Sequence, residues 1–340
     1  MSCRKDLSST EHLFFEPAYL ESSSAAVGRS SLDKVVNLTK ADVSMMNRRL
    51  KPEISENLAG YAFMAPTLVV LGTFIVLPIL YAVFLSLQKV QLLGGIKYEF
   101  VGLRNFARLQ EDERVWIALR NTAEYVAIVV PAQTLLALLL AVTLNAGIRG
   151  KGLWRIIYFL PTVTSSTVLT LIFMWIYNTN GLLNRFLAAI ALPTYNWLGD
   201  PAVALKGIML MNIWSTAPFF MVIYLAALQD IPRSLYEAAE IDGASPWGRF
   251  WFITLPLLKP VTFFVMAMGV IGTFQLFDQS YIISNGSGGP NNATLTLVLL
   301  IYQYVFRDLQ MGYAAAIAFL LAALIILITL IQKRLFSGDR

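Results

Sequence analysis

The sequence predicts an all-α integral membrane protein that crosses the bilayer six times. Of its 340 residues, 57% are hydrophobic and 14% are charged, whereas a soluble domain carries about 25% charged residues. Six stretches contain no Asp, Glu, Lys or Arg, and each reaches the roughly 18 residues that a helix needs to span the hydrocarbon layer. These stretches are Ala59–Gln88, Tyr125–Ile148, Ile156–Asn184, Gly207–Gln229, Pro260–Phe277 and Leu309–Gln332.

The elements follow one another in a simple order. Residues 1–55 are polar, rich in Ser and charge, and lack a sustained apolar period, so we expect a disordered tail. The transmembrane domain follows over 56–336. Two shorter apolar runs, 186–199 and 293–306, fit interfacial or re-entrant segments better than spans. The six spanning helices are expected at about 61–87, 122–146, 155–178, 206–229, 258–282 and 311–332.

The positions of the basic residues predict the orientation of the chain. Lys and Arg occur in the N-terminal tail, at 149–155, at Arg233 and Arg249, and at the C-terminus. The positive-inside rule therefore places both termini in the cytoplasm. One loop, 89–120, disagrees, because it holds six basic residues yet lies outside in this topology. The net charge of +5 thus indicates orientation and contact with anionic lipid headgroups rather than with nucleic acid.

A polar segment at 231–256 separates the fourth and fifth apolar runs, and it predicts two short helices joined by a turn. The first helix has a start signal at Pro232 and a capping-box spacing between Ser234 and Glu237. It is expected to stop at Asp242-Gly243, because glycine adopts the left-handed conformation that ends helices at little cost.

The second helix of this segment is predicted to begin with Ser245 as N-cap and Pro246 in the first turn. Pro256 is expected to end or kink it. The aromatic residues that would anchor it at the membrane interface are Trp247, Phe250, Trp251 and Phe252. The whole segment is therefore predicted to form a cytoplasmic surface loop that docks on a soluble partner.

Several short motifs support a family resemblance. Within 231–256 they are Glu237-Ala238-Ala239, Gly243, Ile253 and Leu255-Pro256. Elsewhere they are VGLRNFARL at 101–109, NT at 121–122, NIW at 212–214 with Pro218, FQLFD at 274–278, GGP at 288–290 and GYAAAIA at 312–318. Over about residues 55–335 the chain resembles the binding-protein-dependent permeases of ABC importers, in the branch for sugars and glycerol phosphates. Residues 284–287 depart from the compact turn that this branch often has.

The resemblance implies the transmembrane domain of a type I ABC importer, which is not itself an enzyme. The two-helix loop would insert in a cleft of a separate ATPase dimer, which binds ATP and Mg²⁺. A second permease would complete a heterodimer, and an extracytoplasmic solute-binding protein would deliver the ligand. The chain is expected to bind no cofactor and no metal, and to lie among lipids in a bacterial or archaeal cytoplasmic (inner) membrane.

The resemblance assigns coupling with the ATPase to Glu237, Ala238, Ala239, Asp242 and Gly243. The carboxylate of Glu237, near a helix N-terminus, would accept hydrogen bonds from Arg or Lys of the ATPase. Ala238 and Ala239 keep the helix thin enough to enter a cleft. Gly243→Asp is predicted to abolish transport while the protein still inserts, because a side chain there disfavours the left-handed turn.

Polar residues inside the apolar runs are candidates for the substrate path, because polar groups are costly in lipid. They include Asn212 and Ser215 in the fourth run and Gln275 and Asp278 near the end of the fifth. Amides and carboxylates beside aromatic rings suit sugars, which present hydroxyls and apolar ring faces. The alternative role is to hold neighbouring helices together by hydrogen bonds. The sequence leaves both roles open for Asn212 and Gln275 and favours a structural role for Asp278.

Other classes of protein lack the residues that they require. The phosphate-binding sequence GxxxxGK[ST] is absent, so the energy for transport must come from another polypeptide. The single His12 and the single Cys3 lie in the N-terminal tail and supply neither a metal site nor a catalytic set. The alternative function is ion-coupled secondary transport, which needs ionisable groups near the bilayer centre, and only Asp278 comes close.

Overall fold

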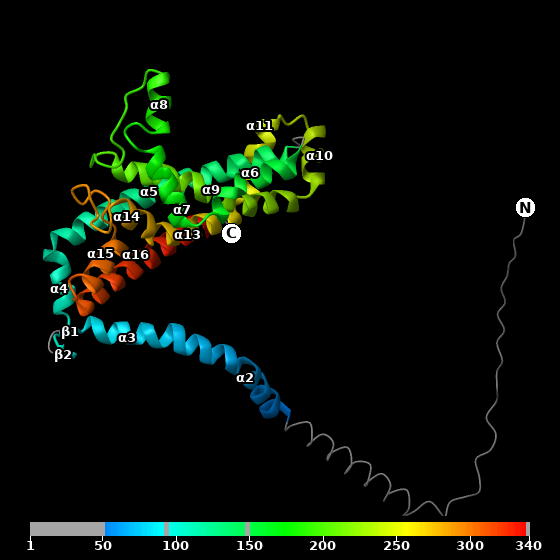
Figure 1. Cartoon of the computed structure of the whole chain (residues 1–340). Helices are drawn as coiled ribbons and strands as arrows, with labels where there is room; N and C mark the ends of the chain where they lie inside the picture. Colours follow the sequence, from blue (N-terminus) through cyan, green and yellow to red (C-terminus); the bar gives the residue numbers. More distant parts are fainter. Residues whose placement is uncertain (1–51, 92–94, 147–149, 338–340) are drawn as a thin grey trace, which may run out of the picture. The chain divides into compact units, whose positions relative to one another are not determined.

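The computed structural model describes residues 52–91, 95–146 and 150–337, and they are predominantly helical (Figure 1). The predicted tail over 1–55 lies outside the described residues up to position 51, and α2 begins at Pro52. One compact unit, up to Val76, contains α2 (Pro52–Leu71) and a π-helical turn, η1 (Gly72–Val76). A second compact unit begins at Leu77 and holds the remaining elements.

The second unit contains an antiparallel β-hairpin in a largely helical chain. In the hairpin, β1 (Gln88–Gln91) pairs with β2 (Lys97–Phe100). Its helices are, in chain order, α3 (Leu77–Ser86), α4 (Arg104–Glu111), α5 (Glu113–Asn145), α6 (Lys151–Val163), α7 (Ser166–Ile176), α8 (Leu182–Ala189), α9 (Ala204–Asp230), α10 (Arg233–Ile241), α11 (Pro246–Arg249), the π-helical turn η2 (Phe250–Thr254), α12 (Leu255–Leu257), α13 (Lys259–Phe274), α14 (Asp278–Ile283), α15 (Leu297–Phe306) and α16 (Met311–Ser337).

Five helical stretches of the described residues are long and apolar enough to cross a membrane, or six if one bent pair counts as a single span. The fourth expected helix, 206–229, corresponds to α9, and the sixth, 311–332, corresponds to α16. The second begins at Glu113 rather than near 122, because the side chain of Asp112 caps its first turn by accepting a hydrogen bond from the Arg114 amide at 2.9 Å.

The prediction of one continuous third helix over 155–178 is wrong. The segment forms α6 and α7, which meet at an angle of 97°. Thr164 and Ser165 between them have extended backbones, with ψ of 137° and 134°. Pro161 removes one amide hydrogen from the last turn of α6, and the Thr162 hydroxyl donates to the Ser215 carbonyl at 3.1 Å instead of staying within its own helix. The absence of charged residues over 156–178 gave no sign of this bend, because it carries no information about a hydrogen bond to another helix.

The fifth expected helix, 258–282, is interrupted as well. The helix α13 ends at Phe274, residues 275–277 are non-helical, and α14 begins at Asp278. The hydroxyl of Thr296, the N-cap of α15, donates to the Leu276 carbonyl at 2.8 Å and so satisfies a group that the break exposes. The short helix α15 is embedded in the bundle, with Leu299 and Leu300 fully buried, as its re-entrant length suggested.

The hydrophobic clusters define the directions of the long helices. Tyr125, early in α5, and Leu205, early in α9, share one cluster. Leu144 and Leu228, near the ends of the same two helices, share another. The helices α5 and α9 are therefore parallel, so α4 and the segment after α9 lie at opposite ends of the bundle (Figure 1). Successive spans of a chain that crosses a membrane repeatedly run in opposite directions, so the second and fourth spans are expected to be parallel.

Motif residues 121–122 join α5 to the segment before α15. The Asn121 amide donates to the carbonyls of Asn292 and Leu295 at 2.8 and 3.0 Å. The buried Thr122 hydroxyl accepts a hydrogen bond from the Leu297 amide at 3.1 Å. These residues hold the re-entrant segment against the bundle. They do not start the helix, although the sequence predicted its start at about 122.

A half-buried carboxylate stabilises the end of the bundle where α5 begins. The hydroxyls of Tyr304 and Tyr313 both donate to Asp112 Oδ2, at 2.5 and 2.9 Å. Burial alone would raise the pKa of Asp112, but these hydroxyls, the Arg114 amide and the charge of Arg108 together hold its pKa below the ordinary value. Asp112 therefore stays ionised at neutral pH and ties α5 to α15 and α16.

Gly312, in the motif at 312–318, allows a close approach between α16 and the end of α3. A Cβ atom at this position would lie 1.9 Å from the Gln88 carbonyl oxygen and 2.8 Å from that of Leu85. Because backbone atoms cannot move aside, we expect Gly312→Ala to destabilise the protein by about 1–3 kcal/mol. The control is Gly152→Ala, where the added Cβ meets nothing within 4 Å. Thermal unfolding of the purified variants tests this, and equal melting temperatures would contradict it.

Candidate functional site: a polar cavity and an exposed two-helix loop

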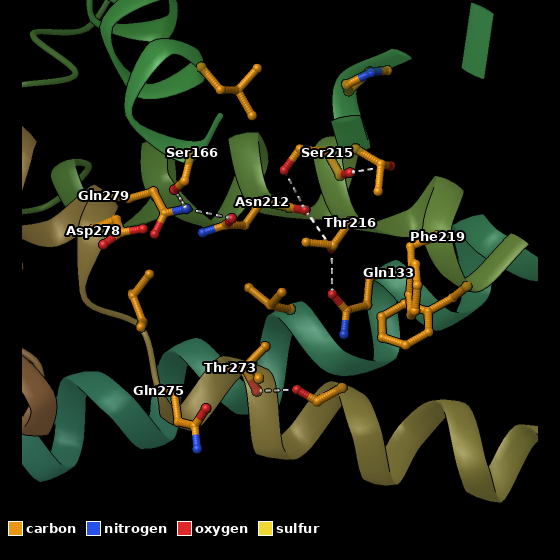
Figure 2. Close-up of a pocket in the computed structure, with 18 of the residues that line it drawn as sticks. Gln133, Ser166, Asn212, Ser215, Thr216, Phe219, Thr273, Gln275, Asp278 and Gln279 are labelled. Atoms are coloured by element: carbon orange, nitrogen blue, oxygen red, sulfur yellow. Dashed lines mark hydrogen bonds between the residues drawn. The ribbon is translucent and has the colours of Figure 1, made fainter. Parts of the chain in front are cut away.

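A cavity of about 470 Å³ lies within the bundle, between α5, the α6–α7 bend, α9, α13 and α14 (Figure 2). All four residues predicted for the substrate path line it: Asn212, Ser215, Gln275 and Asp278. The broken helices contribute directly, because Thr164 and Ser166 come from one break and residues 275–279 from the other. Both interruptions that the sequence failed to predict thus shape this cavity.

Asn212 is the centre of a hydrogen-bond network in the wall of the cavity. Its side chain is 6% exposed, and its amide donates to the buried Tyr125 hydroxyl at 2.5 Å. Its carbonyl oxygen accepts from the Gln279 amide at 3.3 Å, and that amide also donates to Ser166 Oγ at 3.0 Å (Figure 2). The Asn212 amide group therefore joins α5, α9 and α14, with α7 linked through Gln279. Both ends of its side chain are already used.

Gln133 is a wall residue that the sequence analysis missed. Its side chain is 1% exposed, and its carbonyl oxygen accepts from the Thr216 hydroxyl at 2.7 Å (Figure 2). Gln133 lies in the second apolar run, where it is an uncharged polar residue between Ala132 and Thr134. The argument that selected Asn212 and Gln275 would have found it, had it been applied to that helix.

Gln275 and Asp278 differ from Asn212 in being exposed. They lie at the end of α13 and the start of α14, on either side of the break. Neither side chain makes a hydrogen bond or an ion pair with any other described residue, and both line the cavity. Their amide and carboxylate are therefore available to a ligand, next to the Phe277 ring.

The charge of the cavity is simple. Asp278 is its single carboxylate, and among the described residues no Lys, Arg or His lines it. The rest of the lining consists of hydroxyls, amides, glycines and apolar side chains, with the rings of Phe219, Phe220 and Phe277. Such a lining can donate and accept hydrogen bonds and stack against an apolar ring face, and it offers no cation to a strongly anionic ligand.

The segment after α9 forms the two helices that the sequence predicts. The first, α10, ends in a turn in which the Ala244 amide donates to the Ala239 carbonyl at 2.8 Å and the Gly243 amide to that of Glu240 at 3.1 Å. These two bonds are the Schellman arrangement, and Gly243 has the left-handed φ of 79° that it requires. Ser245 then caps α11, accepting from the Gly248 amide at 3.1 Å.

One detail of this loop differs from the prediction. The helix α10 begins at Arg233 with Pro232 as N-cap and no side-chain cap, so Ser234 and Glu237 do not form a capping box. The helix α12 ends at Leu257, one residue after Pro256, and Leu258 forms a turn before α13 begins at Lys259, as the proline led us to expect. The chain passes through the π turn η2, in which the Leu255 amide bonds to the Phe250 carbonyl, and continues as α12 and α13.

Hydrogen bonds and an ion pair hold the loop together, and the residues predicted for coupling are mostly exposed. The Tyr236 hydroxyl lies 2.9 Å from Thr254 Oγ1, and Arg249 pairs with Glu240 at 3.0 Å. Glu237, Ala238, Asp242 and Gly243 are exposed, and Ala239 is half-buried. The most exposed apolar side chains around them are Ile241 (87%), Trp247 (72%) and Phe252 (83%). The loop thus presents a rigid, partly apolar surface.

The cavity and the loop share one helix. Ser215, in the cavity wall, and Asp230, at the loop, belong to α9 and are separated along its axis by about 22 Å at 1.5 Å per residue. On the far side of the cavity, α13 leads directly from the loop to Gln275. A displacement of the loop would therefore reach the cavity through two helices.

Comparison with known proteins identifies the chain. Residues 133–338 match the family model of the binding-protein-dependent transport system inner membrane component. The chain belongs to this family. It is 39% identical over 277 residues to the lactose transport system permease protein LacF of Rhizobium radiobacter, covering 80% of this chain and 92% of that protein.

Further relatives of this permease have similar names. The chain is 34% identical to the trehalose/maltose transport system permease protein MalF of Thermococcus litoralis, over 85% of this chain and 97% of that protein. Its fold matches the crystal structure of a bacterial ABC transporter involved in the import of alginate, with a TM-score of 0.71 at 22% identity, covering 86% of this chain and 99% of that chain.

These findings confirm the predicted family and the all-α, multi-pass fold of a type I importer permease. None of them supports the ion-coupled secondary transporter that was the alternative. The roles of the individual loop and cavity residues stay predictions. The cavity residues differ in whether their side chains already form hydrogen bonds within the protein. The side chain of Asn212 forms hydrogen bonds with Tyr125 and Gln279, whereas those of Gln275 and Asp278 bond to no other described residue.

Proposed function

We propose that this permease carries a carbohydrate across the cytoplasmic membrane of a bacterium or archaeon, driven by a separate ATPase. The observation that carries the proposal is the cavity in the bundle, with hydroxyls, amides and aromatic rings and one carboxylate. Its volume of about 470 Å³ is that of a small-molecule site. The printed names of its relatives, which include lactose, trehalose/maltose and arabinooligosaccharide transport systems, support a sugar as the cargo.

The proposed contacts follow from the exposure of each side chain. Gln275 donates and accepts hydrogen bonds with sugar hydroxyls, Asp278 accepts from them, and Phe277 stacks against the apolar face of the ring. Asn212 and Ser215 line the wall, and Asn212 acts chiefly by holding the surrounding helices in place. Because one chain supplies only part of a path, a second, similar permease would provide the opposite wall.

The loop is the proposed attachment point of the ATPase dimer, which would hold ATP and Mg²⁺. Glu237 would pair with a basic residue of the ATPase, while Ala238 and Ala239 would fit its cleft. The turn at Asp242 and Gly243 fixes the angle between α10 and α11. This assignment puts the loop and both termini in the cytoplasm, and an extracytoplasmic solute-binding protein would deliver the cargo to the other end.

The proposal is tested by transport with defined energy sources. The permease and its copurifying subunits are reconstituted in proteoliposomes with the solute-binding protein and a radiolabelled neutral oligosaccharide. We expect uptake that requires ATP, is blocked by vanadate and is indifferent to proton or sodium gradients. Uptake driven by an ion gradient without ATP would overturn the proposal, as would ATP-driven uptake of solutes that are not carbohydrates.

A further inference from the structure

The basic loop at 89–120, which the positive-inside rule does not explain, gathers part of its charge around one pocket. Three of its six basic residues, Lys89, Arg104 and Arg108, line a pocket of about 400 Å³. The pocket lies between β1, α4 and the start of α16. It is at the opposite end of the bundle from α10 and α11 (Figure 1). The polar cavity in the bundle shares none of its residues.

The walls of this basic pocket are held firmly. The Asn105 amide donates to the carbonyls of Ser86 and Gln88, at 2.8 and 3.0 Å, which fixes α4 against the strand that follows α3. The Arg108 guanidinium donates to Gln310 at 2.7 Å and lies 4.0 Å from the centre of the Tyr313 ring. The motif at 101–109 therefore builds a preformed site, and the cavity and the coupling loop make no use of it.

The positive charge in the pocket is only partly offset by carboxylates, because the charge of Arg108 also acts on Asp112, which does not line the pocket. No Asp or Glu lines the pocket, and Lys89, Arg104 and Arg108 form no ion pair with any described residue. Glu99 is the cross-strand partner of Lys89 in the hairpin, but no ion pair joins them within 4.0 Å. Arg114 shows the contrast, because it pairs with Asp308 at 3.5 Å and does not line the pocket.

Large apolar side chains are exposed on the segments next to the pocket. Phe100 ends β2 and is 71% exposed, and Leu103 precedes α4 and is 70% exposed. Arg104 and Arg108 lie one helical turn apart, so both guanidinium groups can reach the same phosphate. Apolar anchors beside paired arginines are the combination that favours the surface of a membrane over a protein partner in water.

We propose that this pocket binds the phosphate of an anionic phospholipid headgroup, with the acyl chains lying along Phe100 and Leu103. Arg104 and Arg108 donate bidentate hydrogen bonds to the phosphate oxygens, and Lys89 supplies a third positive charge. The lipid would be held where β1, α4 and α16 meet, which explains why an external loop retains this basic charge.

The test measures lipid retention by the intact transport complex. The complex is purified from nanodiscs of phosphatidylcholine with a minor fraction of phosphatidylglycerol, and bound lipid is counted by native mass spectrometry. The test variant is Lys89→Gln with Arg104→Gln. The control is Lys97→Gln with Arg120→Gln, which removes the same charge from exposed residues that do not line the pocket.

We expect the test variant to retain at least about tenfold less phosphatidylglycerol than wild type, and the control to match wild type. Binding of phosphatidylcholine should be unchanged in both. Equal loss in the two variants would overturn the proposal, because it would indicate a diffuse effect of net charge. Unchanged lipid retention with weaker docking of the solute-binding protein would also overturn it, since the pocket would then serve a protein partner.

Discussion

Gly243→Val is expected to reduce ATP-driven uptake at least about tenfold while the protein still inserts and folds. The turn between α10 and α11 needs the left-handed φ of 79° at this position, which costs a residue with a Cβ about 1–2 kcal/mol, and more for a β-branched one. A cost of that size shifts the population of the turn by about tenfold, and the shift falls on the surface proposed to meet the ATPase. Uptake by proteoliposomes at constant protein content is the measurement.

The matched control is Gly243→Asn, because asparagine tolerates the left-handed region far better than valine. A Cβ at this position meets nothing within 4 Å, so inside the chain the two variants differ mainly in backbone strain. We expect Gly243→Asn to keep most of the activity. If both variants transport normally, the turn has no part in coupling. If both are inactive, the side chain itself, rather than strain in the turn, obstructs the partner.

Asn212→Ala and Gln275→Ala are expected to fail in opposite ways. Asn212→Ala leaves the buried Tyr125 hydroxyl without its partner, at a cost of about 1–3 kcal/mol. Its melting temperature should fall by about 2–4 °C per kcal/mol. Gln275→Ala removes a side chain that bonds to no other described residue, so its melting temperature should match wild type while the apparent affinity for the sugar falls about three- to tenfold.

The two readouts separate packing from substrate contact. Thermal unfolding and the concentration dependence of uptake are measured on the same preparations of both variants. A stable Asn212→Ala protein with impaired uptake would show that Asn212 binds the cargo, contrary to its position in the network. A destabilised Gln275→Ala protein would show that Gln275 supports the break between α13 and α14.

The sequence predicted the features that depend on local chemistry. Charge-free length located the spans, and the stop at Asp242-Gly243 followed by Ser245-Pro246 located the two loop helices. These signals work because an N-cap serine or a left-handed glycine acts through its own backbone. The residues of the cavity were also within reach, since polar side chains in apolar runs are few, although Gln133 was overlooked.

The predictions that were wrong concern features that depend on contacts between residues far apart in the sequence. The bend between α6 and α7 is stabilised by Thr162, whose hydroxyl bonds to the carbonyl of Ser215 in α9. At the break after Phe274, the Leu276 carbonyl accepts a hydrogen bond from the hydroxyl of Thr296, which is the N-cap of α15. Periodicity within one segment cannot report a partner supplied by another.

The most direct test of the central claim is cross-linking at the exposed loop. Cys3 is the single cysteine in the chain, so Cys3→Ser with Ala238→Cys gives one reactive thiol on α10. The control thiol is Ala107→Cys on the exposed side of α4. We expect a short bifunctional reagent to join the Ala238→Cys protein to its ATPase, and the Ala107→Cys protein to leave the ATPase free. Efficient sugar uptake without any link between the loop and an ATPase would contradict the account.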